Sequence, residues 1–217
     1  MRIKVEGEIF ENYQTENTRF NHEIYSMILN NLSTDLAKRI HEKKRFKRLF
    51  SFTTLYIEGN KAHLYICGED NLIKDFINNI IKNQIVRIGE IVMSITDIRL
   101  LQNELKESEN YKFKGNLIVN DKLNGKVHLL ENLDYIKTRI NQILKDKYYQ
   151  IYNEKINDNL EIDFDTIERK YVKYKNHHLN SYNVRFNVKG NNKLVNLMYN
   201  VGIGENTASG HGFIWRI

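Results

Sequence analysis

The sequence predicts an α+β protein in which the order strand, helix, strand, strand, helix, strand occurs twice along the chain. Apolar residues recur at two-residue spacing in the expected strands and at three- and four-residue spacing in the expected helices. A polar, charged run at residues 102–110 separates the two series. This order is that of the ferredoxin-like (RRM-like) βαββαβ unit. We therefore expect two tandem units, an N-terminal domain at residues 1–103 and a C-terminal domain at residues 104–217 that carries a glycine-rich loop.

The N-terminal unit is expected to open with a strand over residues 2–9, where apolar and polar residues alternate. Asn21 is a candidate N-cap for an amphipathic helix whose apolar residues are Ile24, Met27, Ile28 and Leu32. The elements expected after it are a short helix around 36–40, strands over 49–57 and 62–67 joined by a turn at 58–61, a helix over 71–83, and a strand over 85–101 broken near Gly89. Cys67, the one cysteine, is expected in the core.

The C-terminal unit is expected to begin with a strand over residues 111–119, followed by a long helix through residues 133–148 with one apolar stripe. The remaining elements are strands over 160–175 and 179–188 paired around a turn at 176–178, a short helix over 194–201, and a closing strand at the end of the chain. The two units account for all 217 residues.

Composition limits the classes of function. The formal net charge of +6 favours a polyanionic partner, although a solvated basic surface gives the same total. A single cysteine cannot form an internal disulfide, and no long apolar run indicates secretion or membrane insertion. We therefore expect a soluble, cytoplasmic protein with no membrane partner.

Four glycines form two Gly-x-Gly pairs close to the end of the chain: Gly202, Gly204, Gly210 and Gly212. Because glycine tolerates positive φ and close backbone approach, such pairs are typical of loops whose amides are open to an anionic ligand. Thr207 stands where a dinucleotide fingerprint needs a third glycine, and no Gly-Lys-Ser/Thr follows. The pattern therefore favours binding of an anionic backbone over binding of a nucleotide cofactor.

A dense group of cations, the basic cluster, follows the second expected helix and consists of Lys38, Arg39, Lys43, Lys44, Arg45, Lys47 and Arg48. These charges repel one another, and bound phosphates would neutralise them. A solvated surface is the alternative interpretation. His41 lies at the margin of the same helix's apolar face, next to the basic cluster.

The glycine pattern resembles the signature loop of the CRISPR-associated repeat-processing endoribonucleases of the Cas-six type. Residues 21–25, Asn-His-Glu-Ile-Tyr, are similar to the Asn-His-x-x-Tyr with which family members often begin their first helix. Residues 40–50 also resemble the family, with a hydrophobic residue, His and Glu, then a cation, then Leu-Phe entering a strand. The resemblance implies two ferredoxin-like domains with the glycine-rich loop after the last helix.

The resemblance also implies a metal-independent endoribonuclease that processes CRISPR repeat RNA from pre-crRNA to crRNA. In this chemistry the 2′-hydroxyl attacks the adjacent phosphorus and leaves a 2′,3′-cyclic phosphate and a 5′-hydroxyl. A base, an acid and a stabilising cation assist the step. Histidine suits either proton-transfer role near neutral pH, so His41 is the first catalytic candidate, with both roles open.

The other catalytic candidates are less sharply defined. Counting six residues from His41 selects Lys47 as the stabilising cation, whereas alignment on Leu-Phe selects Arg48. A tyrosine that assists in some relatives is matched by Asn31, so Tyr25 is the nearest alternative, with helix-edge packing as its competing interpretation. The RNA-binding candidates are Lys38, Arg39, Lys43, Lys44, Arg45, Gly202, Gly204, Gly210, His211, Gly212 and Arg216.

We expect neither a metal nor any other cofactor, because the histidines and Cys67 lack metal-site spacing. His211 either faces RNA or flanks a tight turn, and Trp215 is expected in the core. The implied partner is CRISPR repeat RNA, with a CRISPR effector complex as a further candidate, and the chain is a monomer or a homodimer. Two alternatives stay open: an RNA-binding protein that does not cut, and a basic ferredoxin-like domain unrelated to RNA.

Overall fold

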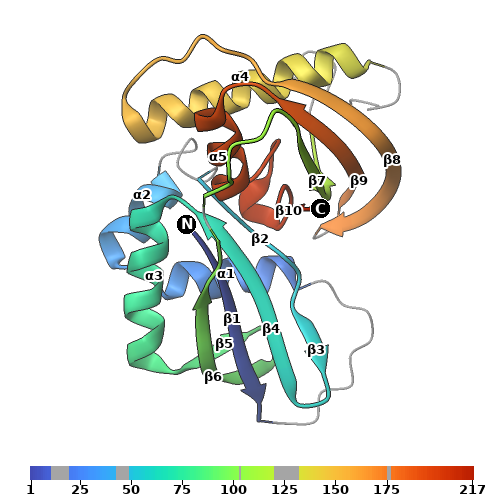
Figure 1. Ribbon diagram of the computed structural model, residues 1–217. Coiled ribbons are helices and arrows are strands. Elements are labelled where there is room, and N and C mark those ends of the chain that lie inside the picture. The colour runs from blue at the N-terminus through green and yellow to red at the C-terminus, as the bar shows by residue number, and fades with distance from the viewer. Residues whose placement is uncertain (11–19, 43–48, 103, 120–131, 175–176) are drawn as a thin grey trace.

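The computed structural model describes residues 1–10, 20–42, 49–102, 104–119, 132–174 and 177–217. For residues 41–42 and 171–180 it describes the backbone alone. The described residues form two sheets, each with its own hydrophobic core and its own helices. Figure 1 shows the two sheets as the lower and upper halves of the molecule.

The first sheet has the strand order β2-β4-β1-β6-β5, with β3 also paired to β4. Its strands are β1 (Arg2–Ile9), β2 (Phe50–Phe52), β3 (Tyr56–Glu58), β4 (Lys61–Gly68), β5 (Ile85–Ile88) and β6 (Ile91–Leu100). The helices of this half are α1 (Asn21–Asn30), α2 (Thr34–Glu42) and α3 (Asp70–Asn83). Alternation along the strands buries side chains such as Val5 and Leu64 against apolar helix residues such as Ile24 and Phe76.

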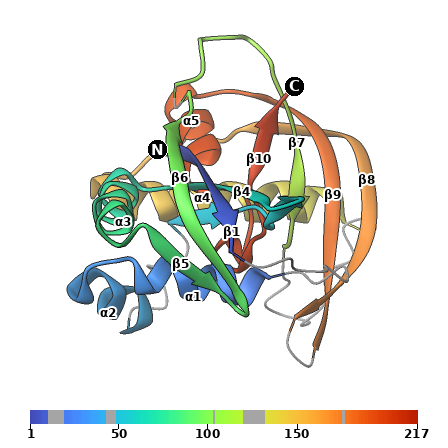
Figure 2. The same ribbon diagram turned by 90° about the horizontal axis from the view of Figure 1, so that it is seen from below.

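The second sheet has the strand order β10-β7-β9-β8. Its strands are β7 (Tyr111–Leu117), β8 (Glu161–Tyr174), β9 (His177–Lys189) and β10 (Ile214–Arg216). Helices α4 (Leu133–Tyr152) and α5 (Asn192–Val201) pack on its apolar face, and a short 3-10 helix, η2 (Thr207–Ser209), lies within the glycine-rich loop. The hairpin of β8 and β9 extends beyond the two shorter strands, as Figure 2 shows.

Both sheets place the first strand of their unit beside its third and fourth strands, as a ferredoxin-like unit does. The predicted α+β fold of two such units is confirmed, and an added strand, β5, extends the edge of the first sheet. Cys67 is buried, as expected. The placement of the domain boundary stays a prediction, because residue 103 lies outside the described residues.

Three local expectations are wrong. The strand expected over 49–57 is divided into β2 and β3, because the hydroxyl of Thr53 accepts the Tyr65 amide at 3.0 Å in place of a backbone carbonyl. Asn21 is the first residue of α1 and not its N-cap, which is Phe20. Residues 177–178, expected in a turn, begin β9 and pair with the end of β8.

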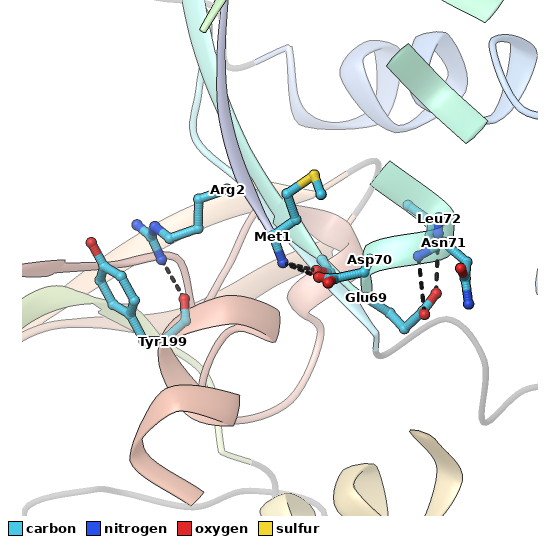
Figure 3. A network of polar contacts seen from close by, with 8 residues as sticks. Met1, Arg2, Glu69, Asp70, Asn71, Leu72 and Tyr199 are labelled. Atoms are coloured by element: carbon cyan, nitrogen blue, oxygen red, sulfur yellow. Dashed lines mark hydrogen bonds and ion pairs between the residues drawn. The ribbon is translucent and has the colours of Figure 1, made fainter. Parts of the chain in front are cut away.

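The N-terminal strand joins the two halves through Arg2, whose side chain is fully buried. Its Nη2 donates to the carbonyl oxygen of Ile214 at 2.7 Å. Its Nη1 donates to the carbonyl oxygen of Tyr199, and Figure 3 shows this contact. The guanidinium also lies 3.8 Å from the ring centroid of Tyr199 and 4.2 Å from that of Phe213. Arg2 therefore ties the first sheet to both ends of the glycine-rich loop. Among the helices described, none has the length and apolar character needed to cross a membrane.

Candidate nucleic-acid interface

The glycine-rich loop, residues 202–213, connects α5 to β10 and folds into a compact double turn. All four of its glycines have positive φ, between +75° and +83°. A Cβ on Gly212 would lie 2.1 Å from the carbonyl oxygen of Ile203, so this position has no room for a side chain. The loop conformation therefore requires glycine at this crossing for both steric and conformational reasons.

Several amides of this loop are hydrogen-bonded within the protein. Ile203 donates to Gly212 at 2.9 Å, Gly212 donates to the carbonyl oxygen of Asn116 at 2.7 Å, and Glu205 donates to Ile118 at 2.8 Å. The four glycines are buried. These bonded amides fasten the loop to β7 and to itself. Binding of an anionic ligand by the loop glycines stays a prediction.

The loop also contacts the first half of the chain. The Asn21 side-chain amide donates to the carbonyl oxygen of Ser209 at 2.9 Å, and Ser51 Oγ donates to the carbonyl oxygen of His211 at 2.8 Å. The His211 side chain is 1% exposed, with Nδ1 at 3.4 Å from Ser181 Oγ. Ser51 is the second residue of β2, so the chain that leads into β2 ends beside the loop. Asn21 is the first residue of α1, so the loop contacts the start of that helix.

The catalytic candidates lie in or next to that stretch. His41 is on the last turn of α2, and its side chain is outside the described set. The candidates Lys43, Lys44, Arg45, Lys47 and Arg48 lie outside the described residues.

The other site candidates are described in full. Tyr25 is half-buried on α1, and its ring stacks on Phe50 with centroids 6.2 Å apart and planes 6° apart. Lys38 and Arg39 are exposed on α2, and Arg216 is exposed on β10. The loop contacts α1 and β2. Arg216 is the last residue of β10, at the end of that strand that is farther from the loop.

A cleft of about 450 Å³ opens between the two halves, where the polar face of the second sheet meets the rim of the first. Its floor includes the buried loop residues Gly210 and His211. Its walls carry hydrogen-bonding and charged side chains, namely Asn21, Thr53, Thr54, Lys114, Asn116, Thr166, Glu168, Asn183 and Arg185. Trp215, expected in the core, is half-buried and lines this cleft.

Lys114 and Arg185 line the cleft but were not among the binding candidates expected from the sequence. The available signal was alternation: Tyr111 and Phe113 are buried on one face of β7, whereas Lys112 and Lys114 are exposed on the other. An exposed sheet face of a ferredoxin-like unit is the surface on which RNA-recognition domains stack unpaired bases. The arrangement can thus hold a polyanion by charge and unpaired bases by stacking.

Comparison with known proteins agrees with this fold. Residues 120–215 match the family model described as CRISPR associated protein Cas6, C-terminal. A CRISPR-associated endoribonuclease Cas6 of Methanocaldococcus jannaschii is 28% identical over 244 residues, which cover 100% of this chain and 93% of that protein.

Several solved structures share this fold. A CRISPR associated protein Cas6 matches with a TM-score of 0.78 at 24% identity, covering 100% of this chain and 99% of that one. A Cas6-related protein from Pyrococcus furiosus matches with a TM-score of 0.83 at 18% identity, covering 100% and 98% of the two chains. A protein described as a RAMP protein binding different RNA substrates also has a TM-score of 0.83, at 17% identity, covering 100% and 99%. At these identities the solved structures establish the fold.

Proposed function

Because this chain belongs to the Cas6 family of CRISPR-associated proteins, we propose that it is an endoribonuclease that cuts CRISPR repeat RNA. One observation carries the proposal. The glycine-rich loop is docked on α1 through Asn21 and on β2 through Ser51. The stretch between these two elements holds His41, Lys47 and Arg48. Arg48 is three residues before Ser51 in the sequence, so a substrate held beside the loop would lie close to the end of the stretch that carries Lys47 and Arg48.

The proposed reaction uses no metal. The 2′-oxygen of one nucleotide forms a bond to the adjacent phosphorus while the bond from phosphorus to the 5′-oxygen of the next nucleotide breaks. A base removes the 2′-hydroxyl proton, and an acid delivers a proton to the leaving 5′-oxygen. We assign one of these proton transfers to His41. We assign stabilisation of the extra phosphoryl charge to Lys47 or Arg48.

We assign RNA binding to the basic cluster, of which Lys38 and Arg39 are exposed on α2. The glycine-rich loop has a positional role in this scheme, because the amides of Ile203, Glu205 and Gly212 are already bonded within the protein. Tyr25 supports the site by stacking on Phe50 and thereby fixing α1 against β2. The RNA ligand is CRISPR repeat RNA, free or within a CRISPR effector complex.

A second candidate, an RNA-binding protein that does not cut, is favoured by Asn31. This residue stands where some relatives have an assisting tyrosine, and it is 7% exposed. Its amide donates to Met27 at 2.9 Å, and its side-chain oxygen accepts from Asn83 at 3.3 Å. Asn31 is thus used in packing, and the tyrosine's contribution would have to come from elsewhere.

Cleavage of a repeat RNA in the presence of EDTA separates the two candidates. We expect cutting to survive chelation and to stop when the nucleotide 5′ to the cut carries a 2′-deoxy sugar, because the nucleophile is then missing. His41→Ala should reduce the single-turnover rate by at least about a hundred-fold and leave RNA affinity within about two-fold. His22→Ala, an exposed histidine on α1, is the matched control and should cut normally.

Two results would contradict this mechanism. Restoration of cutting only by added metal would exclude the metal-independent pathway, and binding without any cutting by the wild-type protein would establish the non-cleaving alternative. Lys47→Ala and Arg48→Ala, assayed separately, should differ, and the variant with the larger loss of rate at unchanged affinity identifies the stabilising cation.

A further inference from the structure

The helix that carries His41 is attached to the first sheet by few side chains. Among the residues of α2 whose side chains are described, Ile40 alone is buried, and it belongs to the first core. Leu36 and Ala37 are half-buried and pack against that core. Because His41 directly follows Ile40, the buried isoleucine fixes the end of α2 that is close to the catalytic candidate. The direction of the helix also depends on contacts at its other end.

That other end is held by Asp75 of α3. The Oδ2 atom of Asp75 accepts the backbone amide of Ser33 at 2.7 Å. Ser33 directly precedes α2, and its carbonyl oxygen accepts the amide of Ala37 at 2.9 Å as the helix begins. Amides at the start of a helix have no partner within the helix, and this end of a helix favours negative charge. Asp75 therefore supplies an acceptor and a negative charge from a neighbouring helix.

A second contact from α3 reaches the same turn between α1 and α2. The side-chain amide of Asn83 donates to Asn31 Oδ1 at 3.3 Å. Asn31 in turn donates from its own side-chain amide to the carbonyl oxygen of Met27 at 2.9 Å, which links α3 to the last turn of α1. The contact of Asn83 thus holds the side of the turn that belongs to α1, and the contact of Asp75 holds the side that leads into α2.

We propose that Asp75 is a positioning residue for the cleavage reaction. Asp75 fixes the start of α2, Ile40 fixes its end, and together they set the place of the backbone at His41. The helix rises about 12 Å between Ser33 and His41, which exceeds the Debye length of about 8 Å at physiological salt, so Asp75 acts through the helix and not by its charge on the imidazole. The proposal deepens the proposed function and rests on it for the role of His41.

The first test compares single-turnover cleavage rates of a repeat RNA. Misplacing a catalytic group by about 1 Å can lower a rate about a hundred-fold, so Asp75→Ala, which removes the acceptor, should lower it about ten-fold and leave RNA affinity within about two-fold. Asp75→Asn keeps an acceptor oxygen in the same place and should stay within about two-fold of the wild-type rate. Equal rates for the two variants, or a matching loss of affinity in Asp75→Ala, would overturn the positioning role.

Asp146→Ala is the matched control for the loss of a helix carboxylate. Asp146 is exposed on α4 and accepts from Gln142 of its own helix at 3.0 Å. The substitution makes the same change of charge as Asp75→Ala, but it removes no contact to α2. The cleavage rate of Asp146→Ala should therefore equal that of the wild type. A loss of rate as large as that in Asp75→Ala would show that net charge, and not the position of α2, is responsible.

The second test observes His41 by NMR in the absence of RNA. In protein labelled isotopically at its histidine carbons, the His41 signal is the one lost in His41→Ala. Asp75→Ala should shift this signal, Asp75→Asn should shift it less, and both should leave the signal of His63 on β4 in place. An unshifted His41 signal in Asp75→Ala would overturn the proposal. Movement of every histidine signal would also overturn it, because Asp75 would then stabilise the whole fold.

The two tests separate this proposal from the proposed function. A wild-type protein that does not cut repeat RNA would contradict the proposed function, whereas a His41 signal that shifts in Asp75→Ala would still show that Asp75 sets the place of α2. A protein that cuts through His41, but whose rate and His41 signal are unchanged in Asp75→Ala, keeps the proposed function and loses the positioning residue.

Discussion

His63 shows how one residue couples the first sheet to pH. It is half-buried on β4, stacked on Tyr56 and paired in register with Glu6 of β1. Burial lowers the pKa of its imidazole, Lys4 lowers it further, and Glu6 and Glu58 act in the opposite direction. The folded protein therefore favours the neutral ring. Alternating residues predicted the strand, but they could not indicate which charged side chains would surround this ring.

We expect His63 to make stability depend on pH. Because its folded pKa is below the ordinary value of 6.5, the folded state binds fewer protons than the unfolded state near that pH. The stabilising contribution is present above 6.5 and is lost as the pH falls through the lower folded value. His63→Gln should therefore reduce the loss of unfolding free energy between about pH 7.5 and about pH 5.5, measured by urea denaturation. His22→Gln at an exposed site is the control, and an unchanged slope in His63→Gln would contradict the assignment.

At the scale of elements, periodicity predicted well where packing is local. The apolar stripes of α3 and α4 lie in the two cores, and the hairpin around Gly59 occurs as expected. The strand expected over 85–101 with a break near Gly89 is instead an antiparallel hairpin of β5 and β6. For the glycine-rich loop, glycine spacing indicated a conformation, but it could not indicate which amides would be bonded within the protein. Positive φ values are typical of anion-binding loops. In this loop they allow the backbone at Gly212 to pass close to the backbone at Ile203.

That crossing makes Gly212 the most demanding position of the loop. Gly212→Ala places a Cβ at φ +83 and 2.1 Å from the carbonyl oxygen of Ile203. The backbone conformation costs about 1–2 kcal/mol, and displacement of the crossing strand adds about 1–3 kcal/mol, so we expect a loss of about 3 kcal/mol in unfolding free energy. Gly59→Ala has φ +62 and nothing within 4 Å of the added Cβ, so only the conformational cost of about 1 kcal/mol applies. Equal losses in denaturation would contradict the steric part.

At the scale of the molecule, the sequence predicted two units but not how they meet. In the sequence Arg2 is one of the polar residues that alternate with apolar residues along β1. This pattern does not indicate that its guanidinium contacts Tyr199 and Ile214. The cleft has the same origin, because Lys114, Arg185 and Thr53 come from three separated strands or turns. Such contacts depend on the packing of one sheet against the other, which local periodicity does not encode. Tyr25 and His41 could be named in advance because both lie in short motifs.

The contact between the halves should depend strongly on Arg2. Arg2→Met keeps a long apolar stem, but it leaves the carbonyl oxygens of Tyr199 and Ile214 without this donor and removes the cation from the rings of Tyr199 and Phe213. Each buried acceptor left unpaired costs about 1–3 kcal/mol, so we expect a total loss of about 3 kcal/mol. This corresponds to a fall of about 6–12 °C in Tm for a chain of this length.

Arg99→Met is the matched control for this change. Arg99 also lies in the first sheet, but its side chain is 64% exposed and pairs with Glu6 and Asp97 at the surface. Exposed ion pairs contribute about 0–1 kcal/mol, so Tm should fall by no more than about 4 °C. A variant of Arg2 with wild-type Tm would show that the two halves are held together by their other contacts.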